Sequence, residues 1–226
     1  MSLADGDKEL ILKTYKSQKD YMYYRKNQIL AEFESPDIKK FIYLTKGRIK
    51  GNASLLEKAL EKKLGHKKIF NNITDVIGIR VIVLYPQHIA KVDKFIREMV
   101  AKNGWSFNED PKAYQWDMKI IQYFKDQKID IKPESDKNNR YSGIHYVIRF
   151  GAAGCNLPRC EIQIKNPFEE LWGEIDHRIR YKAKNCTREQ EFALDAIAGL
   201  HAPLFENLKT ICPSDKLMFS QTEQEP

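Results

Sequence analysis

The stretch Val76-Ile77-Gly78-Ile79-Arg80-Val81-Ile82-Val83-Leu84 has the strongest pattern in this chain. Aliphatic and β-branched side chains fill it except at Gly78 and Arg80, which is typical of a strand that is buried on both faces. We therefore expect this strand at the centre of a β-sheet.

Arg80 is unusual in such a strand, because an unpaired buried charge costs several kcal/mol. It needs either a partner or a ligand. One interpretation is a salt bridge to a carboxylate such as Asp75, although five positions along a straight strand put the two side chains on opposite faces unless Gly78 marks a bulge. The other interpretation is a ligand, because a planar guanidinium can stack on a purine base.

The segments that follow carry further helix and strand patterns. Residues 89–100 have helical spacing and end at Asn103-Gly104, a common helix C-cap. Apolar and polar side chains alternate along residues 144–150 and 160–165, which predicts two strands with one polar face each. Asn166-Pro167, followed by two acids, predicts a helix start. The core side of that helix would carry Phe168, Trp172, Ile175 and Ile179.

Helical patterns extend the chain at both ends. Residues 8–34 have apolar side chains at near-helical spacing, and Ser35-Pro36 ends the pattern. A second helix is expected to begin at the N-cap Asn52. A last helix from about Arg188 is expected to bend or divide at Pro203. The expected core sides are Ala53, Leu56, Leu60 and Leu64 in the second helix, and Ala193, Ile197, Leu200, Leu204 and Leu208 in the last.

These patterns favour one α+β unit, with a mixed β-sheet flanked by helices and helical extensions at both ends. Residues 108–140 are polar and irregular, with a short strand expected near Ile129 and Ile131. We expect four segments: an N-terminal helical extension (1–42), a core (43–184), a C-terminal helical extension (185–212) and a disordered tail (213–226).

Composition narrows the class of protein. The chain has 226 residues, enough for a sizeable core, and its 38 Lys and Arg against 31 Asp and Glu give a net charge of +7. This charge suits anionic partners such as nucleotides or RNA. The four cysteines form no CxxC pair, no apolar run could cross a bilayer, and the N-terminus lacks signal-peptide features. We therefore expect a soluble cytoplasmic protein with free thiols and no membrane partner.

Two carboxylates could hold a metal ion. Asp75 stands at the start of the apolar strand, and Glu161 points out of an alternating strand beside Gln163. Mg²⁺ prefers hard oxygen ligands, usually one or two carboxylates completed by phosphates and water. The alternative is that Asp75 caps its strand and Glu161 is solvated, as exposed acids commonly are.

Basic residues gather around the predicted helix start at position 52. Arg48 and Lys50 lie on a Gly-flanked turn, while Ser54 and Lys58 lie four positions apart and so are neighbours on the helix surface. Cationic donors at a helix N-terminus favour phosphate binding. A solvated basic face is the alternative.

Four further residues could face a ligand. Tyr141 lies in a loop entering the strand of His145, where its ring could stack on a base and Gly143 would let a backbone approach closely. His145 could bind phosphate or orient a hydroxyl. Glu174 and His177 lie about one turn apart on one predicted helix. A packed tyrosine, a structural histidine and ordinary surface residues are the alternatives.

Taken together, these motifs resemble the synthetase domain of the RelA/SpoT family, the GTP pyrophosphokinases that make the alarmones ppGpp and pppGpp. The resemblance covers about residues 43–182, and the order and spacing of the motifs carry it. The chain has no room for the hydrolase and regulatory domains of the long enzymes, so it resembles the small stand-alone synthetases. The motifs are Gly47-Arg48-Ile49-Lys50 with Ser54 and Lys58, then Asp75-Val76-Ile77-Gly78-Ile79-Arg80, then Glu161-Ile162-Gln163-Ile164-Lys165, and finally Trp172 through His177 to Tyr181-Lys182.

The resemblance implies a nucleotidyltransferase-like fold and the transfer of the β,γ-pyrophosphate of ATP to the ribose 3′-hydroxyl of GDP or GTP, with AMP leaving. It implies that Arg48 and Arg80 sandwich the adenine and that Asp75 and Glu161 position Mg²⁺. Glu161 would also accept the hydroxyl proton, and Tyr141 would stack on guanine. The other implied roles are phosphate binding on the ATP side, by Lys50, Ser54 and Lys58, and acceptor binding, by Lys137, His145 and Gln163.

Two departures from the family pattern concern the acceptor. The family commonly has Asn-Gly-Tyr-Arg-Ser-Leu-His where this chain has Asn139-Arg140-Tyr141-Ser142-Gly143-Ile144-His145, and the family's Glu-His pair is Asp176-His177 here. We therefore assign no catalytic role to Asp176. The altered loop leaves open a toxin-type relative that pyrophosphorylates the 3′ end of tRNA, and a catalytically silent nucleotide- or RNA-binding module is the other alternative. The apolar faces of the terminal helices predict a homo-oligomer.

Overall fold

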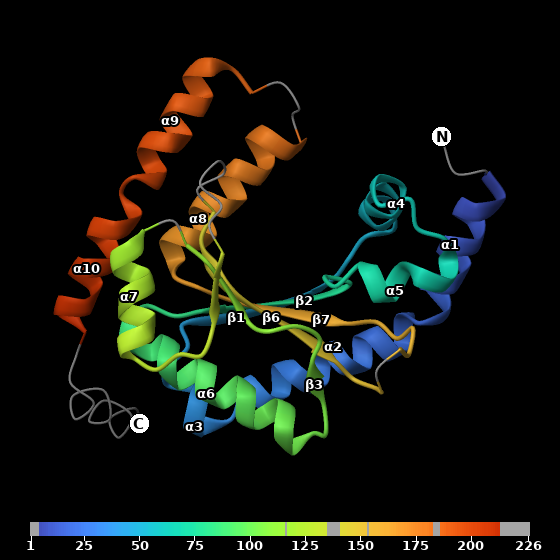
Figure 1. Cartoon of the computed structure of the whole chain (residues 1–226), viewed down its shortest axis with the longest axis horizontal. Coiled ribbons are helices and arrows are strands. Elements are labelled where there is room, and N and C mark those ends of the chain that lie inside the picture. Colours follow the sequence, from blue (N-terminus) through green and yellow to red (C-terminus); the bar gives the residue numbers. More distant parts are fainter. Residues whose placement is uncertain (1–4, 116, 135–140, 153, 183–185, 213–226) are drawn as a thin grey trace, which may run out of the picture.

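A mixed β-sheet forms the centre of the molecule (Figure 1). The computed structural model describes residues 5–115, 117–134, 141–152, 154–182 and 186–212, and within them the sheet has seven strands. Their order is β1-β2-β7-β6-β4-β5, with β3 paired to β6, and only the pairs β2–β7 and β4–β5 are parallel. The strands are β1 (Leu44–Ile49), β2 (Ile77–Ile82), β3 (Ser106–Phe107), β4 (Lys112–Tyr114), β5 (Lys132–Glu134), β6 (Gly143–Arg149) and β7 (Cys160–Lys165).

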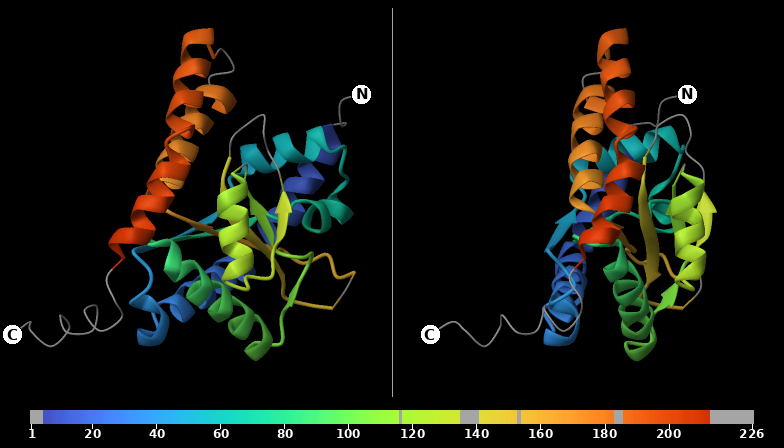
Figure 2. Two further views of the ribbon diagram at one scale, coloured as in Figure 1. Left: turned by 60° about the vertical axis from the view of Figure 1, so that its left-hand side comes forward. Right: turned by 90° about the vertical axis from the view of Figure 1, so that its left-hand side faces the viewer.

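Helices lie on both faces of the sheet. They are α1 (Asp5–Ser17), α2 (Lys19–Phe33), α3 (Pro36–Lys39), α4 (Asn52–Glu61), the 3-10 turn η1 (His66–Lys68), α5 (Ile69–Asn72), α6 (Pro86–Lys102), α7 (Met118–Asp126), α8 (Pro167–Asp176), the π-helical turn η2 (His177–Lys182), α9 (Arg188–Ala198) and α10 (His201–Ile211). Figure 1 shows α2, α3 and α6 below the sheet, with α4 and α8 above its opposite ends. Figure 2 shows α9 and α10 nearly in line, beside α8. No helix of the described residues is long and apolar enough to cross a membrane.

The main core lies between the sheet and the helices below it. Ile77, Ile79 and Val81 alternate along β2 and are fully buried. On the neighbouring strand β1, a side chain at Gly47 would come within 2.9 Å of Leu30 on α2. Glycine at this position therefore leaves room for the side chains of α2 to pack directly against the sheet.

The predicted α+β class is confirmed, with a mixed sheet and helices at both ends. The strand at residues 77–82 is internal, but it lies second from an edge rather than at the sheet centre. The reason is that residues 44–49 form the edge strand β1 antiparallel to β2, and this strand includes Arg48, which was expected on a Gly-flanked turn. The centre is instead the pair β7 and β6, which were expected as strands.

The N-terminal helical pattern is confirmed, but the expected single helix is divided at Gln18 into α1 and α2. Ser17 donates its side-chain hydroxyl to the Thr14 carbonyl, and such bonding competes with the helix ladder. In the next helix, α4, the expected core side was wrong: Leu55 and Ala59 are buried, and the N-cap is Gly51. Of the side chains expected there, only Leu64, beyond the helix end, is buried.

The C-terminal helices differ from expectation in the side they bury. The expected last helix is divided at residues 199–200 into α9 and α10. Pro203 lies in the first turn of α10, where backbone N–H groups have no partner within the helix, so proline breaks no helical hydrogen bond there. Leu194, Ala198, His201 and Phe205 are buried, whereas the expected apolar side is largely exposed. In α8 only Trp172 of the expected core side chains is fully buried.

Residues 108–140 contain more structure than the sequence pattern indicated. The helix α7 buries Ile120, Ile121 and Phe124. The short strand expected near Ile129 and Ile131 is β5, which begins directly after them, at Lys132. The division into four segments stays a prediction. Its tail, residues 213–226, lies outside the described residues.

Candidate active site

The strand register puts polar side chains from five strands on one face of the sheet. Residues directly opposite each other on paired strands point to the same side. One row across the sheet consists of Lys46, Arg80, Gln163, His145 and Lys112. The row beside it consists of Arg48, Gly78, Glu161 and Val147.

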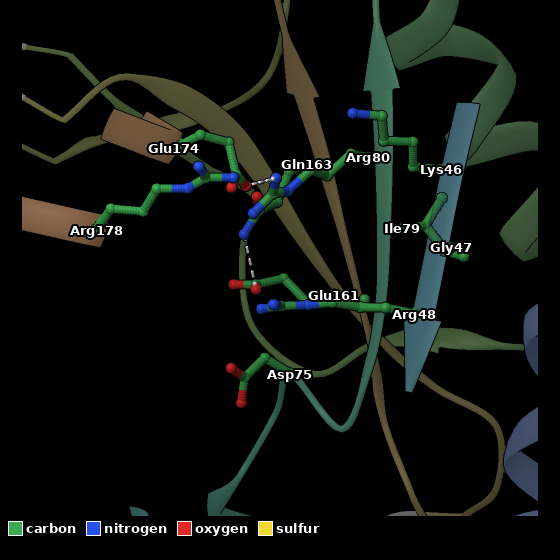
Figure 3. Close-up of a pocket in the computed structure, with 11 residues that line it drawn as sticks. Lys46, Gly47, Arg48, Asp75, Ile79, Arg80, Glu161, Gln163, Glu174 and Arg178 are labelled. Carbon is green, nitrogen blue, oxygen red and sulfur yellow. Dashed lines mark hydrogen bonds and ion pairs between the residues drawn. The ribbon is translucent and has the colours of Figure 1, made fainter. Parts of the chain in front are cut away.

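A pocket of about 620 Å³ lies over these rows. Figure 3 shows Arg48 and Arg80 reaching into it from neighbouring strands, with Glu174 and Arg178 entering from the side of α8 and η2. The Arg48 side chain runs over Gly78, since its Cγ would lie in van der Waals contact, at 3.4 Å, with a Cβ at that position. The carboxylates of Asp75 and Glu161 line the same pocket.

Asp75, just before β2, holds two lysines. Its carboxylate oxygens accept hydrogen bonds from Lys50 Nζ at 2.8 Å and from Lys58 Nζ at 3.0 Å. Burial raises the pKa of Asp75, but the two ammonium groups outweigh burial and hold the pKa below its ordinary value. In this structure, the two lysines expected to bind phosphate are therefore both paired with one ionised acid.

Glu161 belongs to a chain of hydrogen bonds that ends at Tyr141. His145 Nδ1 lies 2.9 Å from Glu161 Oε1, the Tyr141 hydroxyl lies 2.9 Å from His145 Nε2, and Gln163 donates to Glu161 Oε2 at 2.9 Å. Burial raises the pKa of Glu161, but the contacts with His145 and Gln163 lower it further than burial raises it. Burial also raises the pKa of Tyr141, so its hydroxyl keeps its proton. Both contacts of the imidazole are satisfied when His145 carries a proton on Nδ1.

The partners of Arg80 are Glu170 and Glu174 on α8, and not Asp75. Arg80 Nη1 donates to Glu170 at 2.7 Å and also to Glu174. Lys46, opposite Arg80 on β1, lies 3.5 Å from the same Glu170 carboxylate. The half-buried guanidinium is thus paired with carboxylates of α8, and Arg80 also lines the pocket.

Lys165 ends β7 and lies beneath the ring of Tyr141, with Nζ 4.6 Å from the ring centroid. Its side chain is only 3% exposed, and its nearest carboxylate oxygen, on Glu170, is 4.0 Å away. Burial and the charge of Arg80 lower the pKa of Lys165 to about 8, although nearby glutamates raise it. The ring expected to contact the acceptor therefore rests on a buried ammonium group that is weakly paired.

This burial predicts a pH-dependent stability. The folded-state pKa of Lys165, about 8, lies below its ordinary value of 10.5. The unfolded chain therefore binds more protons between these values, so stability rises with pH across the window. Since one pKa unit corresponds to about 1.4 kcal/mol, we expect a relative gain of about 3 kcal/mol in the wild type over Lys165→Met between pH 7 and 10.5. Urea unfolding across this pH range would measure the free energy of unfolding of both proteins. The exposed control Lys94→Met should give a curve of this free energy against pH that runs parallel to that of the wild type. A parallel curve for Lys165→Met would contradict the prediction.

The structure collects most of the expected site residues, but not all of them. In or beside the pocket lie Arg48, Lys50, Lys58, Asp75, Arg80, Glu161, Gln163 and Glu174, with Tyr141 and His145 joined through Glu161. Ser54 and His177 are exposed and are not among the described residues that line the pocket. Lys137 lies outside the described residues.

Sequence reasoning missed Lys46, Lys165, Glu170 and Arg178. Lys46 stands two positions before Arg48, which is same-face spacing once residues 44–49 are a strand. Arg178 follows Glu174 by four positions, a helical spacing that also could have revealed it. Glu170 was interpreted only as an acid favourable to the helix dipole, and no sequence signal links it to Arg80.

Comparison with known proteins identifies the family. A family profile described as "Region found in RelA / SpoT proteins" matches residues 47–186. The chain therefore belongs to the RelA/SpoT family. GTP pyrophosphokinase YwaC of Bacillus subtilis (strain 168) is 23% identical over 151 residues, which are 65% of this chain and 61% of that protein. The match thus spans less than two thirds of that relative's length.

Solved structures share the fold. A GTP pyrophosphokinase family protein from Streptococcus pneumoniae superposes with a TM-score of 0.63 at 19% identity, covering 96% of this chain and 98% of that one. Small alarmone synthetase 1 from Bacillus subtilis, bound to its product pppGpp, gives a TM-score of 0.61 at 21% identity, covering 92% and 97%. At these identities the likeness establishes the fold alone.

Proposed function

We propose that this protein is a GTP pyrophosphokinase that transfers the β,γ-pyrophosphate of ATP to the ribose 3′-hydroxyl of GDP or GTP. The observation that carries this proposal is the pocket in which the acids Asp75 and Glu161 lie among Arg48, Arg80 and the lysines held by Asp75. Membership of the RelA/SpoT family and the similarity to the GTP pyrophosphokinase YwaC support it. The reaction would take place in the cytoplasm, where these nucleotides are available.

We propose Mg²⁺ as the cofactor, held by Asp75 and Glu161. Both carboxyl groups line one pocket, and both have a pKa below the ordinary value, so both are ionised at neutral pH. Magnesium usually takes one or two carboxylates and completes its shell with phosphates and water, so this pair fits without a third protein ligand. When bound, the ion would neutralise charge on the phosphates of ATP.

The donor half of the site would bind ATP by exchanging ion pairs. Lys50 and Lys58, now paired with Asp75, would turn to the phosphates, and Arg48 and Arg80 would sandwich the adenine. Ser54 would complete the phosphate contacts from the first turn of α4. Cations held close to the migrating phosphoryl oxygens stabilise the charge that builds up in the transition state.

The acceptor half would use the hydrogen-bonded chain around Glu161. Glu161 accepts the proton of the 3′-hydroxyl, while His145 and Gln163 hold its carboxylate in place. The 3′-oxygen then bonds to the β-phosphorus as the bond from that phosphorus to the oxygen of AMP breaks. Tyr141 stacks on the guanine, and Lys137 contributes to acceptor binding. Positioning of this kind supplies much of the catalysis in phosphoryl transfer.

The proposal is tested by separating the products formed from γ-labelled ATP with Mg²⁺ and either GDP, GTP or bulk tRNA. We expect the label on a guanosine nucleotide and the release of AMP. Label on tRNA would instead assign the chain to the toxin-type relatives that modify tRNA. No transfer to any acceptor, with ATP still bound, would favour a silent binding module.

A homo-oligomer stays a prediction, and the exposed side of the C-terminal helices gives it a location. The large apolar side chains exposed there are Phe192, Ile197, Leu200, Leu204 and Ile211. We expect light scattering with size-exclusion chromatography to give a mass above that of one chain, and Leu200→Glu to lower it. A wild-type monomer at working concentration would contradict this prediction.

A further inference from the structure

A buried polar cluster joins the C-terminal helix α10 to the loop that carries Tyr141. Its centre is Glu169, in the first turn of α8, whose Oε1 lies 2.9 Å from His201 Nε2 and accepts a hydrogen bond from Ser142 Oγ at 2.8 Å. The other oxygen, Oε2, accepts the backbone N–H of Asn166 at 2.7 Å. Ser142, Asn166 and His201 are all buried.

The capping role of Glu169 does not account for the whole cluster. A capping box needs only the reciprocal contacts between Glu169 and Asn166, and both are present. Burial raises the pKa of Glu169, but hydrogen bonds from His201, Asn166 and Ser142 outweigh it and keep the pKa below the ordinary value. The carboxylate is thus charged. Its Oε1, which the capping box does not use, binds Ser142 and His201, two residues from distant segments of the chain.

The position of His201 is set by the body of the molecule. Its ring lies parallel to that of Phe168, with centroids 6.1 Å apart. One turn later on α10, Phe205 packs against Tyr123 and Phe124 of α7. The imidazole Nε2 is therefore held at a fixed place above the first turn of α8.

The loop end of the cluster has little freedom of its own. Gly143 has φ of +148°, a conformation that other residues rarely adopt, so the backbone path here depends on glycine. Ser142 lies between this glycine and Tyr141, so the hydrogen bond from its hydroxyl to Glu169 fixes the direction from which the Tyr141 ring enters the site. That ring in turn contacts His145, the partner of Glu161.

We propose that His201 is a positioning residue for the acceptor side of the site, acting through Glu169 and Ser142 to hold Tyr141 in place. This inference rests on the proposed function, in which Tyr141 contacts the acceptor base. It makes the C-terminal helix part of the machinery that sets acceptor binding, although no residue of α10 lines the pocket.

The test compares His201→Phe, which removes the donor but keeps a ring, with His201→Gln, which keeps an N–H at a similar reach. Losing a hydrogen bond to a buried carboxylate should raise the KM for GDP or GTP about ten-fold in His201→Phe and leave the KM for ATP within about two-fold. His201→Gln should recover most of this loss. Ser142→Ala should act like His201→Phe, and the double variant should be no worse than either single one.

Leu194→Ala is the matched control, because Leu194 is a buried residue of α9 whose carbonyl accepts a hydrogen bond from Trp172 of α8, and it is not part of the hydrogen-bonded cluster around Glu169 described above. An equal rise of the acceptor KM in this variant, or equal rises for ATP and acceptor in His201→Phe, would reduce His201 to a packing role and overturn the proposal.

Hydrogen exchange of the backbone amides at residues 141–147 gives a readout that needs no activity. We expect faster exchange there in His201→Phe but not in Leu194→Ala. If the wild type proved inactive, the proposed function would be rejected. Faster exchange in His201→Phe would still support the link from His201 to the loop. Unchanged exchange in His201→Phe would overturn that link whatever the enzyme does.

Discussion

Replacing Glu161 by glutamine is expected to slow pyrophosphate transfer by about 10³-fold or more, because the amide can neither accept the hydroxyl proton nor hold a metal ion as a carboxylate does. The substitution keeps the size of the side chain. Hydrogen bonds from His145 and Gln163 now keep Glu161 ionised, so the loss is one of charge rather than of shape. ATP affinity should change far less than the rate.

Initial rates of AMP release, with ATP binding measured in parallel, would check this result. Glu98→Gln is a suitable control, because Glu98 lies on α6 and pairs only with the exposed Lys94 among the interactions seen. Transfer by Glu161→Gln within ten-fold of the wild type would exclude Glu161 as the base. A rate loss shared with Glu98→Gln would point instead to a general loss of folded protein.

The sequence could predict which residues of one strand point to the same face of the sheet. It could not predict the register between strands, which brings residues of different strands together in the site. Alternation along residues 160–165 put Glu161 and Gln163 on one side, and the two-residue spacing of Gly78 and Arg80 would have put those two on one side as well. The pairing of β2 with β7 joins segments about eighty positions apart, and no local pattern fixes which residues then face each other. The edge strand β1 was missed because its one glycine, Gly47, was taken as a turn residue.

Helix positions were predicted better than helix faces. In α4 and α9, apolar side chains occur on more than one side, as with the adjacent Leu55 and Leu56. Periodicity then leaves two candidate faces, and the neighbouring elements decide which one is buried. Lys165 shows the same limit within a strand: it alternates in phase with Gln163, yet α8 begins two residues later and folds over it, so its ammonium group is buried.

Replacing Asp75 by asparagine is expected to have two opposite effects. Transfer with Mg²⁺ should fall by about 10³-fold, since one of the two proposed metal ligands loses its charge. Binding of ATP without Mg²⁺ should become tighter, by roughly ten-fold, because Asp75 competes with the phosphates for Lys50 and Lys58. If Asp75 served only to hold these lysines in place for the phosphates, its replacement would instead weaken the binding of ATP without Mg²⁺.

Equilibrium dialysis of ATP with EDTA, and again with excess Mg²⁺, would separate the two effects. The wild type should gain affinity when Mg²⁺ is added, and Asp75→Asn should gain much less. Asp126→Asn, on the exposed side of α7, removes one charge without touching the lysines and should behave as the wild type. If Asp75→Asn bound metal-free ATP more weakly than the wild type, the acid would be a scaffold for the lysines. If it kept the full response to Mg²⁺, the metal would have to bind elsewhere, and the pairing of Asp75 with Glu161 would lose its proposed purpose.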